Sequence, residues 1–193
     1  MALKRKTNKG FTLIELMVSV SLFALMVAAV SGVFISNIKN QKQILAIQEM
    51  TGQASYGLEF MSRALRMAVK QTGEGISCLS NEGENYELTN GGAGILFINH
   101  LDNDDCQQFF LENNRLKYRR GIGTLSPVTS DLTSPSLRVN ILKFNLIGGS
   151  QADDQQPRVT VFLKIIRNTG AGNSPVSTTV QTTLSQRNLD IVY

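Results

Sequence analysis

The residues that could carry out catalysis are few and scattered. His100 is the only histidine in the 193 residues, so a Ser-His-Asp or Cys-His site would have to use it. No nucleophile motif accompanies His100. The sequence also has no phosphate-binding loop, no clustered Cys/His metal spacing and no dinucleotide-binding glycine pattern. We therefore expect a protein that is not an enzyme and that needs no cofactor.

Two cysteines and one acidic cluster are further candidate sites. Cys78 and Cys106 either form one disulfide, worth roughly 3 to 4 kcal/mol in the loop-entropy model for an exported protein, or remain two unpaired thiols. Asp102, Asp104 and Asp105 are dense in the oxygen ligands that calcium prefers, but they lack the spacing and the distal glutamate of an EF-hand. We expect a solvated turn without a metal there, with calcium as the alternative.

Glu15 is a carboxylate inside an apolar segment. It is the only charged residue between Leu13 and Ile35. A helix of these 23 residues, at about 1.5 Å per residue, would cross the roughly 30 Å hydrocarbon core of a membrane. Four basic residues precede the segment, so the positive-inside bias places the N-terminus in the cytoplasm and the rest of the chain outside. The apolar run is too long for a conventional signal peptide. A plain signal anchor would leave Glu15 unexplained, because an acidic residue in a membrane helix costs about 2.5 to 3.5 kcal/mol and is usually functional.

The stretch Gly10-Phe11-Thr12-Leu13-Ile14-Glu15, after its short basic leader, resembles the prepilin motif of type IV pilins and type II secretion pseudopilins. The resemblance implies that a prepilin peptidase cuts between Gly10 and Phe11 and methylates the new Phe11 amine. It also implies that Glu15 pairs with the N-terminal amine of a neighbouring subunit. The chain would then be a single-pass protein of the bacterial inner membrane, with its head outside, that later joins other pilin subunits in a filament.

Beyond the apolar segment the helical pattern continues and becomes one-sided. No proline occurs before Pro127, so the pattern predicts one helix from Phe11 to Lys70, with Gly73 and Gly75 as stop signals. We expect the apolar stripe to pack on the protein's own sheet. A coiled-coil partner is the alternative, which glycines within the helix disfavour. The stripe consists of Ile47, Met50, Ala54, Leu58, Met61, Leu65 and Ala68.

The remaining chain predicts an antiparallel β head after a glycine-rich loop region over residues 71–94. Strands are expected at 94–100, 107–112, 115–120, 137–148, 157–166 and 176–184. Asn113-Asn114 suits a hairpin turn, and the alternation changes phase at Ile141, which suggests a β-bulge. The expected fold is α+β. It comprises a leader (1–10), a membrane or filament-core helix (11–36), an amphipathic half-helix (37–72) and a head (73–193).

Charge and two short stretches bear on the function. Without the four leader cations, Lys+Arg falls from 19 to 15, equal to the 15 Asp+Glu, so nucleic acid is not expected as a partner. Residues 60–68 and 181–189 resemble stretches of minor pilins, a group that includes the J-type minor pseudopilins. We expect a non-catalytic minor pilin or pseudopilin, at or near the filament tip, that helps to start assembly of a pilus or a secretion pseudopilus. The alternative from another class is a membrane-anchored head that binds DNA or a secreted substrate.

Overall fold

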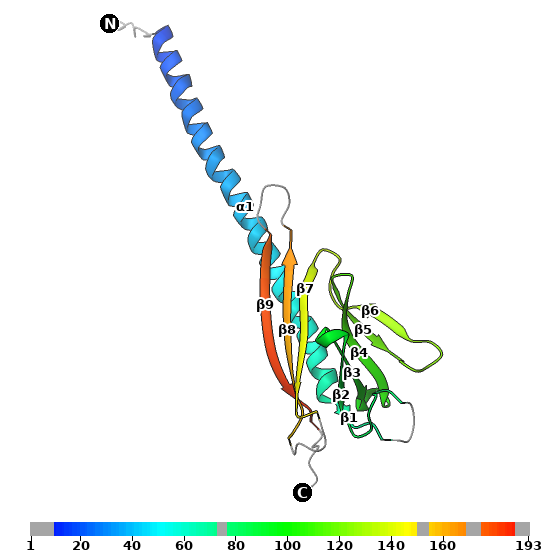
Figure 1. The fold of residues 1–193 in the computed structure, drawn as a ribbon. Coiled ribbons are helices and arrows are strands. Elements are labelled where there is room, and N and C mark those ends of the chain that lie inside the picture. The colour runs from blue at the N-terminus through cyan, green and yellow to red at the C-terminus, as the bar shows by residue number, and fades with distance from the viewer. Residues whose placement is uncertain (1–9, 73–76, 150–154, 169–174, 188–193) are drawn as a thin grey trace, which may run out of the picture. The chain divides into compact units, whose positions relative to one another are not determined.

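The computed structural model describes residues 10–72, 77–149, 155–168 and 175–187. The chain divides into two compact units, residues 1–44 and 45–193. Helix α1 (Leu13–Arg66) contributes to both, since the boundary falls inside it (Figure 1). Residues 1–9 of the expected leader lie outside the described residues, as do the expected stop signals Gly73 and Gly75.

Within the first unit, α1 is apolar on every side from Leu13 to Ile35, apart from Glu15 and three serines. Its large side chains are exposed all along the segment, for example Leu16, Phe23 and Val30. The hydroxyl groups of Ser19 and Ser31 donate to the carbonyls four residues earlier, so these polar groups are satisfied inside the helix. By length and composition α1 is able to cross a membrane. A surface of this kind requires lipid or other helices around it.

Helix α1 ends at Arg66, earlier than the expected end at residues 70–72. Strand β1 (Ala68–Val69) follows at once and pairs with Asn99 and Ile98 of strand β3 (Gly94–Asn99). The backbone of this stretch therefore bonds to a sheet instead of continuing the helical ladder. The buried stripe also differs from the expected one, since Ala46 is buried while Ile47 is 41% exposed, and Ala68 is buried in β1 rather than in the helix.

The head contains two antiparallel sheets where one was expected. The larger sheet has the order β1-β3-β4-β5-β6, and β2 also pairs with β3. Its further strands are β2 (Tyr86–Thr89), β4 (Asp105–Glu112), β5 (Arg115–Arg120) and β6 (Val128–Asp131). Strands β4 and β5 form the expected hairpin, with Asn113 and Asn114 at φ of 53° and 57°. Two short 3-10 turns, η1 (Asn90–Gly92) and η2 (His100–Asp102), flank β3.

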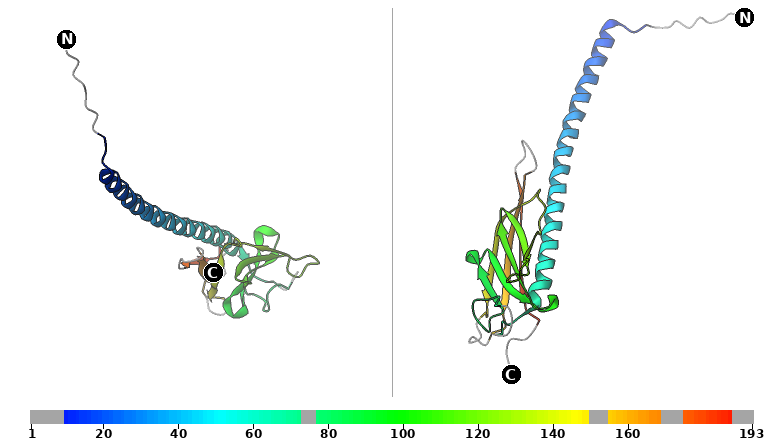
Figure 2. Two further views of the ribbon diagram at one scale, coloured as in Figure 1. Left: turned by 90° about the horizontal axis from the view of Figure 1, so that it is seen from above. Right: turned by 90° about the vertical axis from the view of Figure 1, so that its right-hand side faces the viewer.

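The smaller sheet has the order β7-β8-β9, formed by β7 (Arg138–Ile147), β8 (Arg158–Arg167) and β9 (Val176–Ser185). The register shifts between Val139 and Ile141, so the expected bulge in β7 is confirmed. The three strands lie beside the C-terminal half of α1 (Figures 1 and 2). Gly92 has a φ of +90°, and a Cβ there would lie 3.2 Å from the Phe144 carbonyl oxygen, so glycine permits the close approach of η1 to β7.

One hydrophobic core joins the second half of α1 to both sheets, which confirms the α+β fold. Met50, Met61 and Leu65 of α1 pack in the same buried cluster as Phe97 of the larger sheet and Phe144 of the smaller one.

Strands β2 and β6 were not expected: β2 falls within the region read as a loop, and all four residues of β6 are exposed, so β6 has no apolar alternation.

Candidate functional site

The Gly10–Phe11 bond lies just before the first helical residue, in exposed non-helical backbone. Phe11 is 85% exposed. A Cβ built on Gly10 would meet no heavy atom within 4 Å, so packing within the chain does not require glycine at this position. The bond is therefore accessible to a peptidase, and the reason for Gly10 lies outside the fold of this chain.

Thr12 and Glu15 form a capping box at the start of α1. The Thr12 N–H and hydroxyl donate to Oε2 of Glu15 at 3.0 and 2.9 Å, and the Glu15 N–H donates to Oγ1 of Thr12 at 3.4 Å. These bonds satisfy backbone groups that the first turn of a helix leaves without intrahelical partners. Sequence reasoning missed the role of Thr12, although the spacing Thr-x-x-Glu before an apolar run is a known signal for it.

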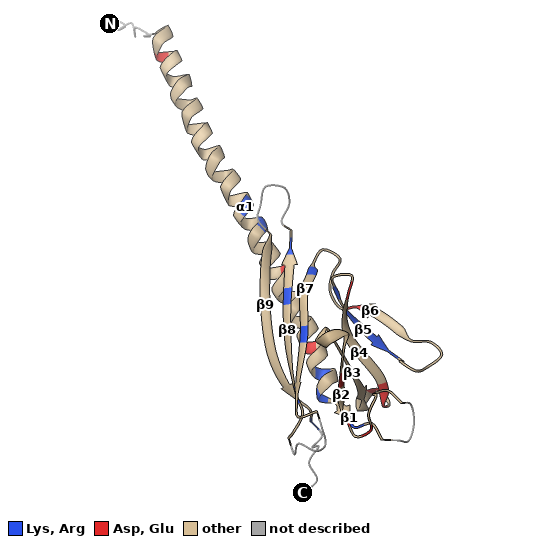
Figure 3. Cartoon of the chain, in the orientation of Figure 1, with Lys and Arg blue, Asp and Glu red and all other residues tan. Residues whose placement is uncertain are grey.

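Glu15 (red near the N-terminal end of α1 in Figure 3) thus has a local partner within its own chain. It is fully exposed in the isolated chain and carries the only acidic side chain of the helix's first turn. The predicted pair between this carboxylate and the amine of a neighbouring subunit remains a prediction, as do cleavage after Gly10 and methylation of Phe11.

Cys78 and Cys106 are joined by a disulfide, with their Cα atoms 5.6 Å apart. The bond ties the segment before β2 to strand β4. Gln71 holds the same segment: its Oε1 accepts the N–H groups of Cys78 and Leu79, and its Nε2 donates to the Leu79 carbonyl at 2.9 Å. Gln71 is buried, and sequence reasoning did not single it out.

The aspartates proposed as calcium ligands are spread over a turn in which each carboxylate already accepts a hydrogen bond from the protein. Asp102 accepts from Gln107 at 2.6 Å, Asp104 contacts Nδ1 of His100 at 2.9 Å, and Asp105 accepts from the Gly121 N–H. Asn103 and Asp104 have positive φ, as in a tight turn. Among the described residues, no group of three or more His, Cys, Asp or Glu side chains could hold a metal ion.

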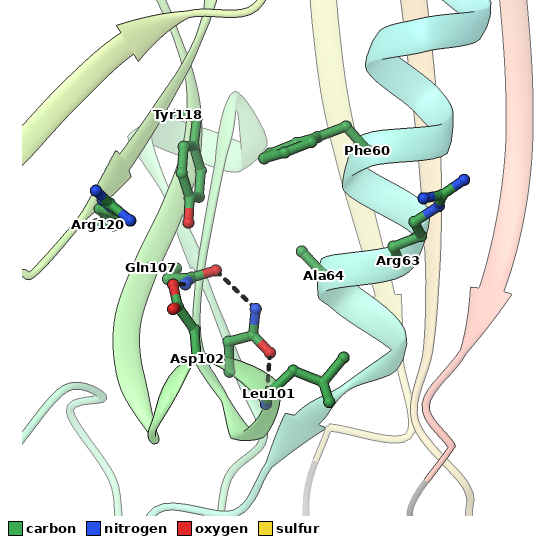
Figure 4. A pocket seen from close by; sticks show the side chains of 9 residues that line it. Phe60, Arg63, Ala64, Leu101, Asp102, Gln107, Tyr118 and Arg120 are labelled. Atoms are coloured by element: carbon green, nitrogen blue, oxygen red, sulfur yellow. Dashed lines mark hydrogen bonds between the residues drawn. The ribbon is translucent and has the colours of Figure 1, made fainter.

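A groove of about 450 Å³ lies between the last turns of α1 and the larger sheet (Figure 4). Phe60 and Tyr118 meet edge to face across it, with ring centroids 5.2 Å apart. On its floor Asn99 Nδ2 donates to Oε1 of Gln107 at 3.0 Å, and Gln107 donates in turn to Asp102. These polar groups satisfy one another, which suits a structural network better than a reacting site.

Burial raises the pKa of Tyr118 to about 12, and the carboxylates of Asp102 and Asp105 add to the rise. The phenol therefore stays protonated at neutral pH. His100 pairs with Asp104 through its Nδ1 in an exposed position. The lining of the groove combines apolar side chains with polar and charged side chains of α1, the larger sheet and η2.

The comparison with protein families agrees with the N-terminal geometry. A model described as the prokaryotic N-terminal methylation motif matches residues 5–31, a range that contains the Gly10–Phe11 bond, the Thr12–Glu15 capping box and most of the apolar segment. A search of curated proteins and a search of solved structures found no match. The motif is that of structural subunits, and together with the exposed apolar helix it fits anchorage in the inner membrane. The chain thus carries the signature of type IV prepilins and pseudopilins at its N-terminus, joined to an α+β fold of the type IV pilin-like kind.

Proposed function

We propose that this chain is a non-catalytic subunit of a type IV filament, which prepilin peptidase processes before assembly. The methylation motif over residues 5–31 carries the proposal. The exposed Gly10–Phe11 bond and the helix that is apolar on every side support it. The precursor inserts with its leader in the cytoplasm and its head on the other side of the membrane.

Assembly then moves the apolar half of α1 from lipid into a bundle of like helices. This transfer is close to neutral in apolar solvation, because lipid chains and the bundle interior are similarly apolar. Packing and polar contacts must therefore decide the register of each subunit. A pair between the Glu15 carboxylate and the amine of a neighbouring Phe11 supplies such a contact, and removal of the leader creates the amine.

Cleavage is tested by expressing the precursor together with a prepilin peptidase and measuring the intact mass. The expected product lacks residues 1–10 and carries the added mass of one methyl group. Gly10→Val is the matched control: a Cβ at this position meets no heavy atom within 4 Å, so the change should block cleavage without disturbing the fold. A wild-type chain that stays uncut would exclude the proposal.

The charge of Glu15 can be separated from its capping role by two variants. Glu15→Gln removes the charge but keeps an oxygen that accepts from the Thr12 N–H. Thr12→Val removes the hydroxyl that bonds to Glu15 but keeps the charge. Both should be cleaved, and only Glu15→Gln should fail to enter filaments. Normal incorporation of Glu15→Gln would contradict the charge pair.

Within this class we propose a minor pilin or minor pseudopilin at or near the filament tip that helps to start assembly. The likeness of residues 60–68 and 181–189 to stretches of minor pilins, a group that includes the J-type minor pseudopilins, supports this assignment. Counting copies of the tagged chain per filament tests it, because a minor subunit occurs in few copies and a major subunit along the whole length. Loss of protein secretion on deletion, with pili intact, would separate the two machines.

A further inference from the structure

Strand β9 is the last strand of the smaller sheet and has one open edge. It pairs with β8 along its whole length, and no other strand of the described residues pairs with it on the other side. Successive residues of a strand point their N–H and C=O groups to opposite edges, so every second residue of β9 directs these groups away from β8. Within the described residues, the backbone of β9 makes no hydrogen bond outside its ladder with β8.

The open edge lacks the features that usually protect an edge strand. Protected edges are short or bulged, or they carry lysine, proline or an inward-pointing charge. Strand β9 is ten residues long, and its sequence, VSTTVQTTLS, has no charged residue and no proline. Its register with β8 continues without a shift from end to end. The edge of β9 is therefore able to accept a further strand.

The inner face of β9 is only half covered. Val176 and Val180 pack against the hydrophobic core but stay partly exposed. Leu163, the partner of Val180 in β8, is 1% exposed. The cover of the core therefore ends at β9. A strand added beyond β9 would bury Val176 and Val180 further if its own inward side chains were apolar.

The outer face of the smaller sheet carries positive charge without negative charge. The outward side chains of β9 are neutral, and in β8 Lys164 lies opposite Thr179 and Arg158 opposite Ser185. Strands β7, β8 and β9 contain no Asp or Glu, as Figure 3 shows by the absence of red. Among the described residues, Lys164 and Arg158 take part in no ion pair. Acidic side chains on the outward side of an added strand would be attracted to these cations, and basic ones would be repelled.

We propose that the open edge of β9 binds an extended acidic segment of a different protein as a further strand of the smaller sheet. The backbone of the segment supplies the hydrogen bonds, and its alternate side chains supply the specificity. Apolar side chains extend the core beyond Val180, and acidic side chains lie on the same face as Lys164. A second copy of β9 does not fit this pattern, because β9 contains no acidic residue. The proposal adds an interaction of the head to the proposed function and does not depend on it.

Hydrogen–deuterium exchange of the full chain in non-ionic detergent, resolved to single residues, tests the proposal. The probe is a synthetic peptide of the length of β9 in which valine alternates with glutamate and threonine. In the free chain every second amide of β9 should exchange fast. At a peptide concentration of about ten times the Kd, these amides should exchange about tenfold more slowly, while those in the ladder with β8 change little. This alternation distinguishes an added strand from non-specific binding.

Two control peptides separate the backbone from the charge. A peptide with lysine in place of glutamate should bind at least about threefold more weakly at low salt, and the difference should shrink at high salt. A peptide with N-methyl groups on alternate amides of one edge cannot bond to β9 through that edge. When both edges are blocked in this way, protection of β9 should be lost.

A matched pair of variants locates the binding edge. T178K/T182K places two inward-pointing charges at half-buried positions of β9, which is a known means of preventing strand addition. T179K/Q181K adds the same two charges on the exposed outer face. The first variant should lose the protection by the acidic peptide, and the second should keep it. Unchanged exchange of the amides of β4 verifies that each head is folded, and the N-methylated peptide tests the edge without any change to the chain.

Three results would overturn the proposal. The first is unchanged exchange of β9 with the acidic peptide. The second is equal protection by the acidic and the basic peptide, which would contradict the role of the cations. The third is protection of alternate β9 amides in the chain alone that rises with its concentration, which would assign the edge to a second copy. None of these results bears on cleavage after Gly10, so the proposed function is judged separately by mass.

Discussion

Opening the Cys78–Cys106 disulfide should lower the stability of the head by about 3.6 kcal/mol at 25 °C, the loop-entropy value for a separation of 28 residues. The bond acts mainly on the unfolded chain, which it prevents from exploring conformations with the two cysteines far apart. The magnitude depends on how little the folded state changes when the bond opens.

The structure indicates that the folded state changes little. Cys106 is 1% exposed and stays paired with Ile98 in the β3–β4 ladder. The N–H of Cys78 is held by the Gln71 side chain at 2.8 Å, with or without the disulfide. The reduced chain should therefore remain folded, with a Tm lower by about 7 to 14 °C, from about 2 to 4 °C per kcal/mol for a protein of this size.

The assay compares thermal unfolding of the full chain in non-ionic detergent with and without a reductant, followed by circular dichroism. Mass after alkylation verifies that the bond has opened. The C78A/C106A variant is the control, because its Tm should not respond to the reductant. An unchanged wild-type Tm after verified reduction would refute the loop-entropy reasoning for this head.

Three further changes have defined outcomes. Gln71→Ala leaves the buried Leu79 N–H and carbonyl and the half-buried Cys78 N–H without their partner, and it should cost about 2 to 4 kcal/mol in urea unfolding. A loss below about 0.5 kcal/mol, as for an exposed substitution, would contradict the role given to Gln71. Gly57→Val overpacks against Leu116, whose Cδ2 lies 3.3 Å from the new Cβ, and should cost about 1 to 3 kcal/mol. Gly52→Val, which meets nothing within 4 Å, is the matched control and should cost nothing by packing. The pKa of Tyr118 rises from 10.0 to about 12 on folding, so its contribution to stability is complete below pH 10 and is lost as the pH rises towards 12. Tyr118→Phe should therefore lose less stability over this interval than the wild type, and equal losses would argue against the shift.

Patterns that depend on neighbours in the sequence were predictable. Val159, Val161, Leu163 and Ile165 alternate without interruption, and all four are buried in β8. The phase change at Ile141 marks a real bulge, because an extra residue moves the apolar side chains to the other parity. The Asn113-Asn114 turn tolerates positive φ, as asparagine does more readily than most residues.

Features that depend on distant partners were not predictable in this way. Strand β2 has one fully buried residue, Tyr86, among exposed or half-buried neighbours, so its strand character comes from pairing with β3. Strand β6 is exposed throughout and exists because β5 offers it an edge. The division into two sheets follows from which strands pair, which alternation does not encode.

Two signals were present in the sequence and were overlooked. The spacing from Thr12 to Glu15 is that of a capping box. The absence of Lys and Arg from residues 71–114 was hidden because charge was summed over the whole chain. Counting charge segment by segment would have shown that the charged residues of 71–114 are all acidic.

The capping box has a thermodynamic consequence for assembly. Before assembly the Glu15 carboxylate accepts two hydrogen bonds from Thr12, so it is not an unpaired charge in lipid. When the carboxylate pairs with another subunit, it exchanges the donors of Thr12 for the amine of that subunit. The driving force is the difference in free energy between these two partners, not the full cost of an unpaired charge. The proposed pair with an amine therefore stabilises the filament by less than it would if Glu15 had no partner in the free subunit.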